Sequence, residues 1–192
     1  MIARLYYVGQ SAWRYRETLA DYAQGLALQA KTLLDIDLDL LKQQGIQGLI
    51  LDFDGVLAAH AAPRPLAIME DWLRKALTVF EPNQLFILSN QPTEARQAYF
   101  RTYFPGISFV CPQRKKPFID GIQIVLDTLG VAPQTVLLID DRLLTGILAA
   151  LMAGIQGCYV TAPWIDWKKR PFSEAWYYLL RRAERWLLTW AV

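Results

Sequence analysis

The 192-residue chain contains few of the residues on which several common kinds of protein depend. Its two cysteines, Cys111 and Cys158, form no closely spaced pair, which excludes a disulfide framework and a cysteine-based zinc site and is typical of a reducing cytosol. The single histidine, His60, lies in an Ala-Ala-His-Ala-Ala segment without an obvious serine partner. This argues against serine–histidine catalysis, which needs a positioned histidine base.

Charge of one sign and long apolar runs are also scarce. The net charge is only +2, so the composition gives no general sign of nucleic-acid binding, and we expect no nucleic-acid partner. No run approaches the roughly 18 apolar residues that would span a bilayer, and residues 1–7 lack a secretory pattern. We therefore expect a cytoplasmic protein, either free or peripheral on the inner face of a membrane.

Hydrophobic residues are abundant, at 54% of the chain, and predict one well-packed domain. From residue 46 onward, short apolar runs alternate with longer helical patterns. The predicted strands are 46–51, 84–88, 107–110, 135–139 and 157–160, and the predicted helices are 65–80, 93–103, 118–129 and 143–153. This alternation indicates an α/β fold in three layers, with helices on both faces of a parallel sheet.

Helical extensions are predicted at both ends of this core. One long helix is expected at 11–34 and another at 172–190, while 35–39 fits a linker or a first edge element. The expected organisation is an N-terminal helical extension (1–40), a core (41–163) and a C-terminal amphipathic helix (164–192).

Polar residues gather at the expected carboxyl edge of the sheet, where active groups lie in parallel α/β folds. Asp52 and Asp54 follow the first strand, Ser89 and Asn90 the second, Lys116 ends a basic cluster before a helix, and Asp140 and Asp141 follow 135–139. Two buried carboxylates are costly unless a cation neutralises them, so the pattern predicts a hard, oxygen-seeking metal ion. Taken singly, Asp54 before Gly55 also fits a solvated turn, and Ser89 also fits a helix cap.

The order Asp52-x-Asp54, Ser89, Lys116 and Asp140-Asp141 resembles the motifs of the haloacid dehalogenase (HAD) superfamily, over roughly 46–160. The resemblance implies a Rossmann-like HAD fold and a Mg²⁺-dependent phosphatase that works through an aspartyl-phosphate. It implies that Asp52 is the nucleophile and that Asp54 is the general acid and base. It assigns phosphate binding to Ser89, Asn90 and Lys116, and Mg²⁺ binding to Asp52, Asp54 (through its main-chain carbonyl) and Asp141. Beyond the resemblance, we expect the adjacent carboxylate of Asp140 to take over part of the metal shell.

Finer similarity lies in 33–38, 41–49, Lys116-Pro117 and 139–145, which resemble the YqeG-type group of HAD subfamily IIIA. That group is similar to mitochondrial phosphatidylglycerophosphate phosphatase, which implies a role in phospholipid biosynthesis. The chain departs from the group's pattern at four positions: Gly55-Val56 replace Asn-Thr, Asp140 replaces Gly, and Gly146 replaces Asp. These departures leave open a HAD-shaped scaffold that binds a partner and catalyses nothing.

The motif spacing leaves no room for a sizeable cap domain. Only 34 residues separate Asp54 from Ser89, and 26 separate Ser89 from Lys116. An open site suits a large or surface-presented phosphomonoester, such as a phospholipid headgroup or a phosphoprotein, whereas a small soluble ester usually needs enclosure. A soluble ester remains the alternative substrate.

The C-terminal segment interleaves aromatic and basic residues. On a helix, one apolar stripe is predicted from Trp176, Leu179, Leu180, Ala183, Leu187 and Trp190. The pattern fits either contact with an anionic membrane surface or packing on the core or in a dimer. The N-terminal helix, with Trp13 and Tyr22 beside Arg14 and Arg16, fits a second membrane contact or simple packing.

Overall fold

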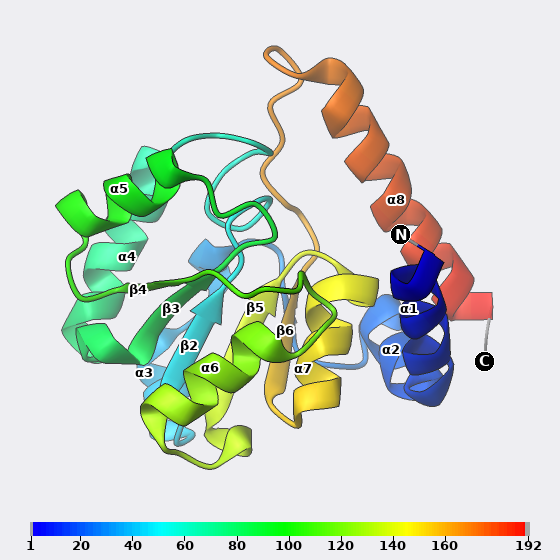
Figure 1. Ribbon diagram of the computed structural model, residues 1–192, viewed down its shortest axis with the longest axis horizontal. Helices are drawn as coiled ribbons and strands as arrows, with labels where there is room; N and C mark the ends of the chain where they lie inside the picture. Colours follow the sequence, from blue (N-terminus) through cyan, green and yellow to red (C-terminus); the bar gives the residue numbers. More distant parts are fainter. Residues whose placement is uncertain (1, 191–192) are drawn as a thin grey trace.

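The computed structural model describes residues 2–190. Its centre is a parallel sheet of six strands in the order β1-β6-β5-β2-β3-β4 (Figure 1). The strands are β1 (Gln29–Ala30), β2 (Gly48–Leu51), β3 (Leu85–Leu88), β4 (Ser108–Val110), β5 (Val136–Asp140) and β6 (Gln156–Val160). The α-helices are α1 (Ile2–Arg14), α2 (Arg16–Gln24), α3 (Leu38–Gln43), α4 (Ala67–Val79), α5 (Glu94–Tyr103), α6 (Asp120–Leu129), α7 (Leu148–Ala153) and α8 (Pro171–Trp190). Short 3₁₀ turns, η1 (Leu33–Asp35), η2 (Pro82–Gln84) and η3 (Pro133–Thr135), and a π-helical segment, η4 (Leu143–Ile147), complete the secondary structure.

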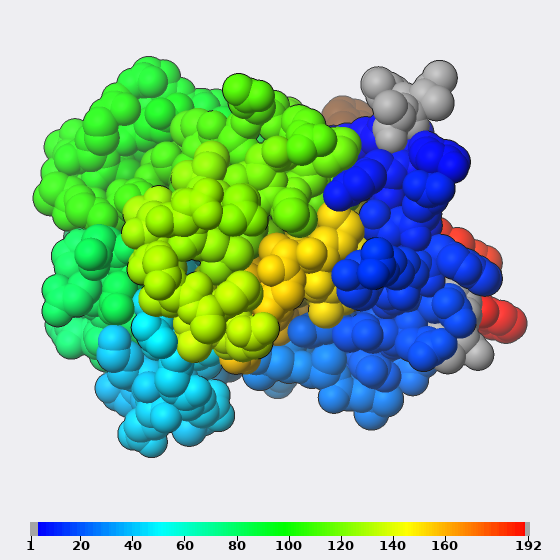
Figure 2. Space-filling view, turned by 60° about the horizontal axis from the view of Figure 1, so that its bottom comes forward, coloured from blue at the N-terminus to red at the C-terminus, as the bar shows by residue number. Residues whose placement is uncertain are grey.

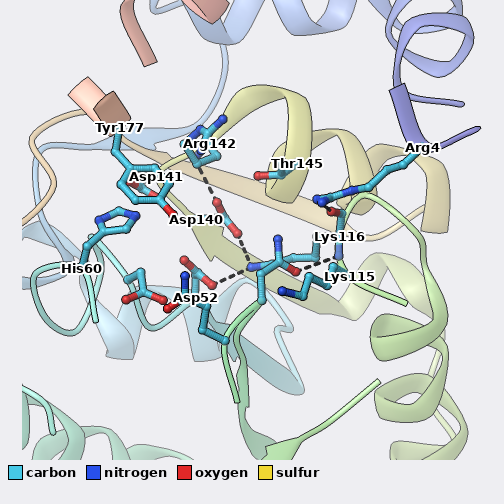
Figure 3. A pocket seen from close by; sticks show the side chains of 13 residues that line it. Arg4, Asp52, His60, Lys115, Lys116, Asp140, Asp141, Arg142, Thr145 and Tyr177 are labelled. Atoms are coloured by element: carbon cyan, nitrogen blue, oxygen red, sulfur yellow. Dashed lines mark hydrogen bonds and ion pairs between the residues drawn. The ribbon is translucent and has the colours of Figure 1, made fainter. Parts of the chain in front are cut away.

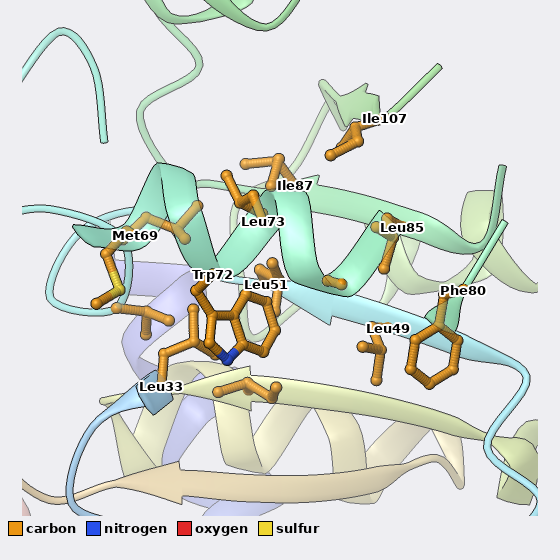
Figure 4. Packing of buried hydrophobic residues seen from close by; sticks show 14 of the residues in the cluster. Leu33, Leu49, Leu51, Met69, Trp72, Leu73, Phe80, Leu85, Ile87 and Ile107 are labelled. Atoms are coloured by element: carbon orange, nitrogen blue, oxygen red, sulfur yellow. The ribbon is translucent and has the colours of Figure 1, made fainter. Parts of the chain in front are cut away.

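Two hydrophobic clusters make the three layers. On one face of the sheet, Leu49, Leu51 and Ile87 pack with Trp72 and Leu73 of α4, together with residues of α3 and α5 (Figure 4). On the other face, residues of β2, β3 and β5 pack against α6 and α7. The predicted α/β fold in three layers is therefore confirmed. Each fully buried Leu or Ile contributes about 1.5–3 kcal/mol to folding.

The central strands are buried on both faces, which explains their continuous apolar sequences. Leu51 of β2 lies in register with Ile139 of β5 and with Ile87 of β3. The amide of Asp52 extends this ladder by donating to the carbonyl of Ile139 at 3.0 Å. The register therefore brings the polar residues that follow these strands to one edge of the sheet.

The N-terminal extension differs from the single helix predicted at 11–34. Helix α1 ends at Arg14, α2 ends before Gly25, which has a φ of +83°, and Gln29–Ala30 then pairs with β6 as an edge strand. A left-handed backbone conformation favours glycine and ends helices. The predicted helix was therefore too long, because it continued past Gly25. Segment 35–39 is also no edge strand, because Asp37 caps α3 by accepting from the amide of Leu40.

Helix α8 forms where a helix was predicted, and the predicted apolar stripe points outward, which contradicts packing of that stripe on the core. Trp176 is 61% exposed and Trp190 is 76% exposed. The inner face instead carries Glu174, Arg181, Glu184 and Leu188, all buried. The reason is that charged residues after β5 face α8. Asp141 pairs with Arg181, and Arg142 pairs with Glu184.

Helices α1, α2 and α8 lie together beside the end of the sheet formed by β1 and β6 (Figure 1). Figure 2 shows the blue N-terminal helices packed against the yellow segment that contains η4 and α7. Within residues 2–190, no helix is long and apolar enough to cross a bilayer. Over the same range, the stretch from β2 to β3 contains α4 and loops but no separate cap domain.

Candidate active site

A polar cavity of about 270 Å³ opens at the carboxyl ends of β2 and β5 (Figure 3). Its lining residues come from both ends of the chain and from the sheet edge: Arg4, Asp52, Asp54, His60, Asn90, Gln91, Lys115, Lys116, Asp140, Asp141, Arg142, Thr145 and Tyr177. All the residues predicted for the site lie at this cavity or directly behind it. The structure thus brings together side chains that are up to 89 positions apart in the predicted motifs, from Asp52 to Asp141.

Lys116 lies between two carboxylates on the floor of the cavity (Figure 3). Its ammonium donates to Oδ1 of Asp52 at 2.7 Å and to Oδ2 of Asp140 at 2.5 Å. Only 2% of Lys116 is exposed, so water screens these charges weakly. The second oxygen of Asp52 does not bond to Lys116.

Burial and neighbouring charges together set the pKa values of Asp52 and Lys116. Burial raises the pKa of Asp52 well above its usual range, Lys116 opposes the rise, and Asp140 adds to it. Burial alone would lower the pKa of Lys116, but the charges of Asp140 and Asp52 raise it above its usual value. Lys116 is therefore a permanent cation at neutral pH, placed where negative charge gathers.

Asp52, Asp140 and Asp141 form a group suited to a metal ion. Each offers one carboxylate oxygen, and these three atoms lie within 4.8 Å of one another. Oδ1 of Asp141 is buried and has no hydrogen-bond partner among residues 2–190. Burial raises the pKa of Asp141 to about 6, and Arg181 limits the rise. An orphaned oxygen among three buried carboxylates fits a hard cation such as Mg²⁺.

The Asp54 side chain does not join that group. Arg96 of α5 holds it through two hydrogen bonds, from Nη1 to Oδ2 at 2.9 Å and from Nη2 to Oδ1 at 2.7 Å. The amide of Ala61 donates to the same carboxylate at 2.9 Å. Burial would raise the pKa of Asp54, but Arg96 outweighs it and the pKa is lowered. The Asp54 carboxylate is therefore held by Arg96 and the Ala61 amide and lies outside the group of three carboxylates.

Ser89 and Asn90 occupy different positions in the loop after β3. Ser89 is buried behind Asp54, and its hydroxyl accepts from the amide of Gln91 at 3.0 Å. It lies 3.5 Å from Oδ2 of Asp54 and outside the lining of the cavity. Asn90 lines the cavity, and its Oδ1 accepts from the amide of Lys116 at 2.8 Å. Asn90 therefore ties the loop after β3 to the loop that carries Lys116.

The sequence matches a profile described as mitochondrial PGP phosphatase over residues 25–164. The chain belongs to the mitochondrial PGP phosphatase family. It is accordingly an enzyme, a phosphoric monoester hydrolase of the HAD type. No curated protein matches the chain. A crystal structure of an uncharacterized protein from Corynebacterium glutamicum is similar, with 23% identity, 61% of this chain and 86% of that chain covered, and a TM-score of 0.48.

At two of the positions that depart from the family's pattern, a residue larger than glycine would clash with the site. Gly55 has a φ of +88°, and a Cβ there would lie 2.4 Å from Oδ2 of Asp141. A Cβ on Gly146 would lie 1.9 Å from Cγ of Asp140. Both distances are far below van der Waals contact, so each glycine leaves room for a carboxylate of the site. Gly146 and Asp140 therefore depend on each other.

The site also uses residues outside the family's matched segment, which sequence reasoning missed. From α8, Arg181 Nε donates to Asp141 Oδ2 at 2.6 Å, and Glu184 accepts from Arg142 and from the amide of Leu143. Arg4 of α1 lines the cavity from the other end of the chain. The available signal was a stripe of polar residues at helical spacing, which marks a helix face that meets a charged surface. This stripe consists of Glu174, Tyr177, Arg181 and Glu184.

Proposed function

We propose that this enzyme removes the terminal phosphate of phosphatidylglycerophosphate, in a Mg²⁺-dependent reaction through an aspartyl-phosphate on Asp52. The observation that carries the proposal is the Lys116 ammonium, 2.7 Å from Oδ1 of Asp52 on the floor of an open polar cavity. The family match supports the substrate. Residues 41–163 would form the catalytic core, with the terminal segments as additions to it.

In the first step, the carboxylate oxygen of Asp52 attacks phosphorus in line with the bond to the leaving oxygen. A new phosphorus–oxygen bond forms as the old one breaks, and Asp54 gives a proton to the leaving alkoxide. Lys116 holds the phosphoryl oxygens and offsets their charge. Asn90 supports this by fixing the Lys116 amide at 2.8 Å.

In the second step, water attacks the phosphorus of the aspartyl-phosphate. Asp54 takes a proton from the water, the bond to Asp52 breaks, and inorganic phosphate leaves. The pairing with Arg96 keeps Asp54 ionised, which suits this base role directly. For the first step Asp54 must carry a proton, so substrate binding has to draw it away from Arg96.

Asp52, Asp140 and Asp141 would hold Mg²⁺, together with the main-chain carbonyl of Asp54. When bound, the ion neutralises charge on the transferring phosphoryl group. Because α8 places Arg181 on Asp141 at 2.6 Å, this arginine orients one of the expected ligands.

The exposed face of α8 supports a membrane-borne substrate. Phe172, Trp176 and Trp190 are 90%, 61% and 76% exposed, and the exposed Arg182 and half-buried Arg185 lie between Trp176 and Trp190 on the helix. Aromatic residues beside cations favour the interface of an anionic bilayer. The inner face of the same helix reaches the cavity, so binding of the outer face would bring the site to the headgroups.

The decisive experiment is phosphate release from phosphatidylglycerophosphate in mixed micelles, with and without Mg²⁺. The wild type is compared with Asp52→Asn and with the control Asp71→Asn, an exposed aspartate of α4. We expect release that requires Mg²⁺ and Asp52 and is unchanged in the control. Cleavage of soluble aryl phosphate but not of the lipid would favour a soluble ester or a phosphoprotein as substrate. No cleavage of either would refute the mechanism.

Flotation with anionic vesicles tests the membrane contact separately. The pair Trp176→Ser and Trp190→Ser should abolish binding, whereas Tyr103→Ser, an equally exposed aromatic on α5, should not change it. If the wild type is a dimer that does not bind vesicles, and the two substitutions abolish the dimer, the aromatic face contacts a second copy of the chain instead.

A further inference from the structure

The cavity has two chemically different sides. Arg4 and Lys115 lie on the side of Lys116, and His60 and Tyr177 lie on the opposite side, stacked with ring centroids 3.5 Å apart (Figure 3). Burial lowers the pKa of His60 to about 4, so this second side carries no positive charge from histidine at neutral pH. The positive charge around the mouth is therefore concentrated on one side.

Arg4 is fixed at this position by the packing of α1. Its Nη2 donates to the main-chain carbonyl of Lys116, and the side chain is partly buried. Three residues further on, Tyr7 stacks on Phe118 with ring centroids 4.5 Å apart. These two contacts hold the first turn of α1 against the loop that carries the phosphate-binding lysine.

The cations at this site differ in how their charge is used. Lys116 is paired with Asp52 and Asp140, and Arg142 of the opposite wall is paired with Glu184. Among residues 2–190, neither Arg4 nor Lys115 forms an ion pair with a carboxylate. A lysine and an arginine that face the cavity and form no ion pair with any of its carboxylates suit a ligand that brings its own negative charge.

The monoester phosphate alone does not account for these two cations. Its oxygens would have Lys116 and the carboxylates of the expected metal site on the floor, whereas Arg4 is half-buried and Lys115 is exposed, so both lie nearer the mouth than the buried Lys116. We propose that Arg4 and Lys115 bind a second phosphate, a phosphodiester, in the leaving group of the substrate. This inference rests on the proposed function and gives it a substrate class: phosphomonoesters whose alcohol carries a phosphodiester.

The assignment explains why a segment outside the family's matched residues reaches the site. Arg4 precedes residue 25, where that match begins. A contact with a group that does not react binds ground state and transition state alike, so it lowers KM and leaves kcat unchanged. Arg4 and Lys115 would therefore set specificity without taking part in the chemical steps.

Two water-soluble substrates test this without any membrane. Glycerophosphoglycerophosphate, the deacylated headgroup, has both phosphates, whereas glycerol 3-phosphate has the monoester only. In Arg4→Gln and in Lys115→Gln, we expect kcat/KM for the first substrate to fall about tenfold through KM, as for loss of a charge-assisted contact. Glycerol 3-phosphate should be cleaved as by the wild type. Arg4→Lys should recover part of the loss, and Arg14→Gln, on the same helix, should have no effect.

The outcomes separate this inference from the proposed function. An equal fall for both substrates would mean that Arg4 only positions Lys116, and would overturn the inference. Unchanged KM for the headgroup in both variants would overturn it as well, while phosphatase activity stands. If the wild type cleaves neither substrate nor the lipid, the proposed function fails and this inference fails with it. Direct binding to Asp52→Asn gives a second readout, since the headgroup should bind about tenfold more weakly when Arg4→Gln is added.

Discussion

Arg96 and Asp54 form a bidentate ion pair beneath the cavity, with Nη–Oδ distances of 2.7 and 2.9 Å, and only 1% of Arg96 is exposed. Arg96→Met would leave the Asp54 carboxylate buried without its partner. We expect the free energy of unfolding to fall by about 3–5 kcal/mol, the cost of breaking a buried pair from one side. Urea unfolding measures this loss.

The matched test is the double variant Arg96→Met with Asp54→Asn, which removes both charges. It should be more stable than Arg96→Met alone, because no uncompensated charge remains. Additive effects of the two substitutions would contradict the importance of the pair.

Gly146→Ala should be destabilising despite the small size of the added group. The new Cβ would lie 1.9 Å from Cγ of Asp140, so either Asp140 or η4 must move, at a cost of about 1–3 kcal/mol. Adding Asp140→Gly should restore part of the stability by vacating the space. Gly9→Ala, in α1 with nothing within 4 Å, should instead stabilise by about 0.5–1 kcal/mol. Thermal unfolding of the wild type and these three variants is the measurement.

Mg²⁺ should stabilise the folded protein through the three carboxylates of the site. A ligand at 100 times its Kd raises the free energy of unfolding by about 2.7 kcal/mol. We expect a rise in Tm on adding Mg²⁺ that EDTA reverses and that Asp141→Asn largely removes. The comparison uses NaCl at equal ionic strength as the control. An identical rise in wild type and Asp141→Asn would place the ion elsewhere.

His60 should make the protein less stable as the pH falls. Burial lowers its pKa in the folded state to about 4 from the ordinary 6.5, and Arg181 and Arg142 lower it further, against the opposing effect of Asp54. The unfolded chain thus binds more protons between these values, so stability is full above pH 6.5 and is lost as the pH falls toward 4. From pH 7 to pH 5 the loss is about 2 kcal/mol.

His60→Phe is the matched variant, because it keeps an aromatic ring against Tyr177. Its urea midpoint should fall less than that of the wild type between pH 7 and pH 5. Equal falls in the two proteins would assign the pH dependence to other groups.

The amino-acid sequence by itself determined the core and its chemistry. Strands such as 136–140 are continuous apolar runs because both of their faces are buried, and this pattern is visible without a structure. The gathering of Asp52, Lys116 and Asp141 was predictable because polar residues that follow parallel strands meet at one edge of the sheet. Helices α4 to α6 followed from their 3.6-residue periods, with ends within three residues of the prediction.

Only the tertiary structure decided which partners these elements meet. A two-residue edge strand, Gln29–Ala30, has no period of its own and exists because β6 offers it hydrogen bonds. Helix α8 turns its charged face inward because Arg181 forms an ion pair with Asp141 and Glu184 forms one with Arg142. The periodicity of the sequence alone would predict that the apolar face is buried. Arg4 reaches the cavity because α1 packs on the loop of Lys116, a contact between residues 112 positions apart. Local sequence fixes the period of an element, but the surface that it meets sets which face is buried.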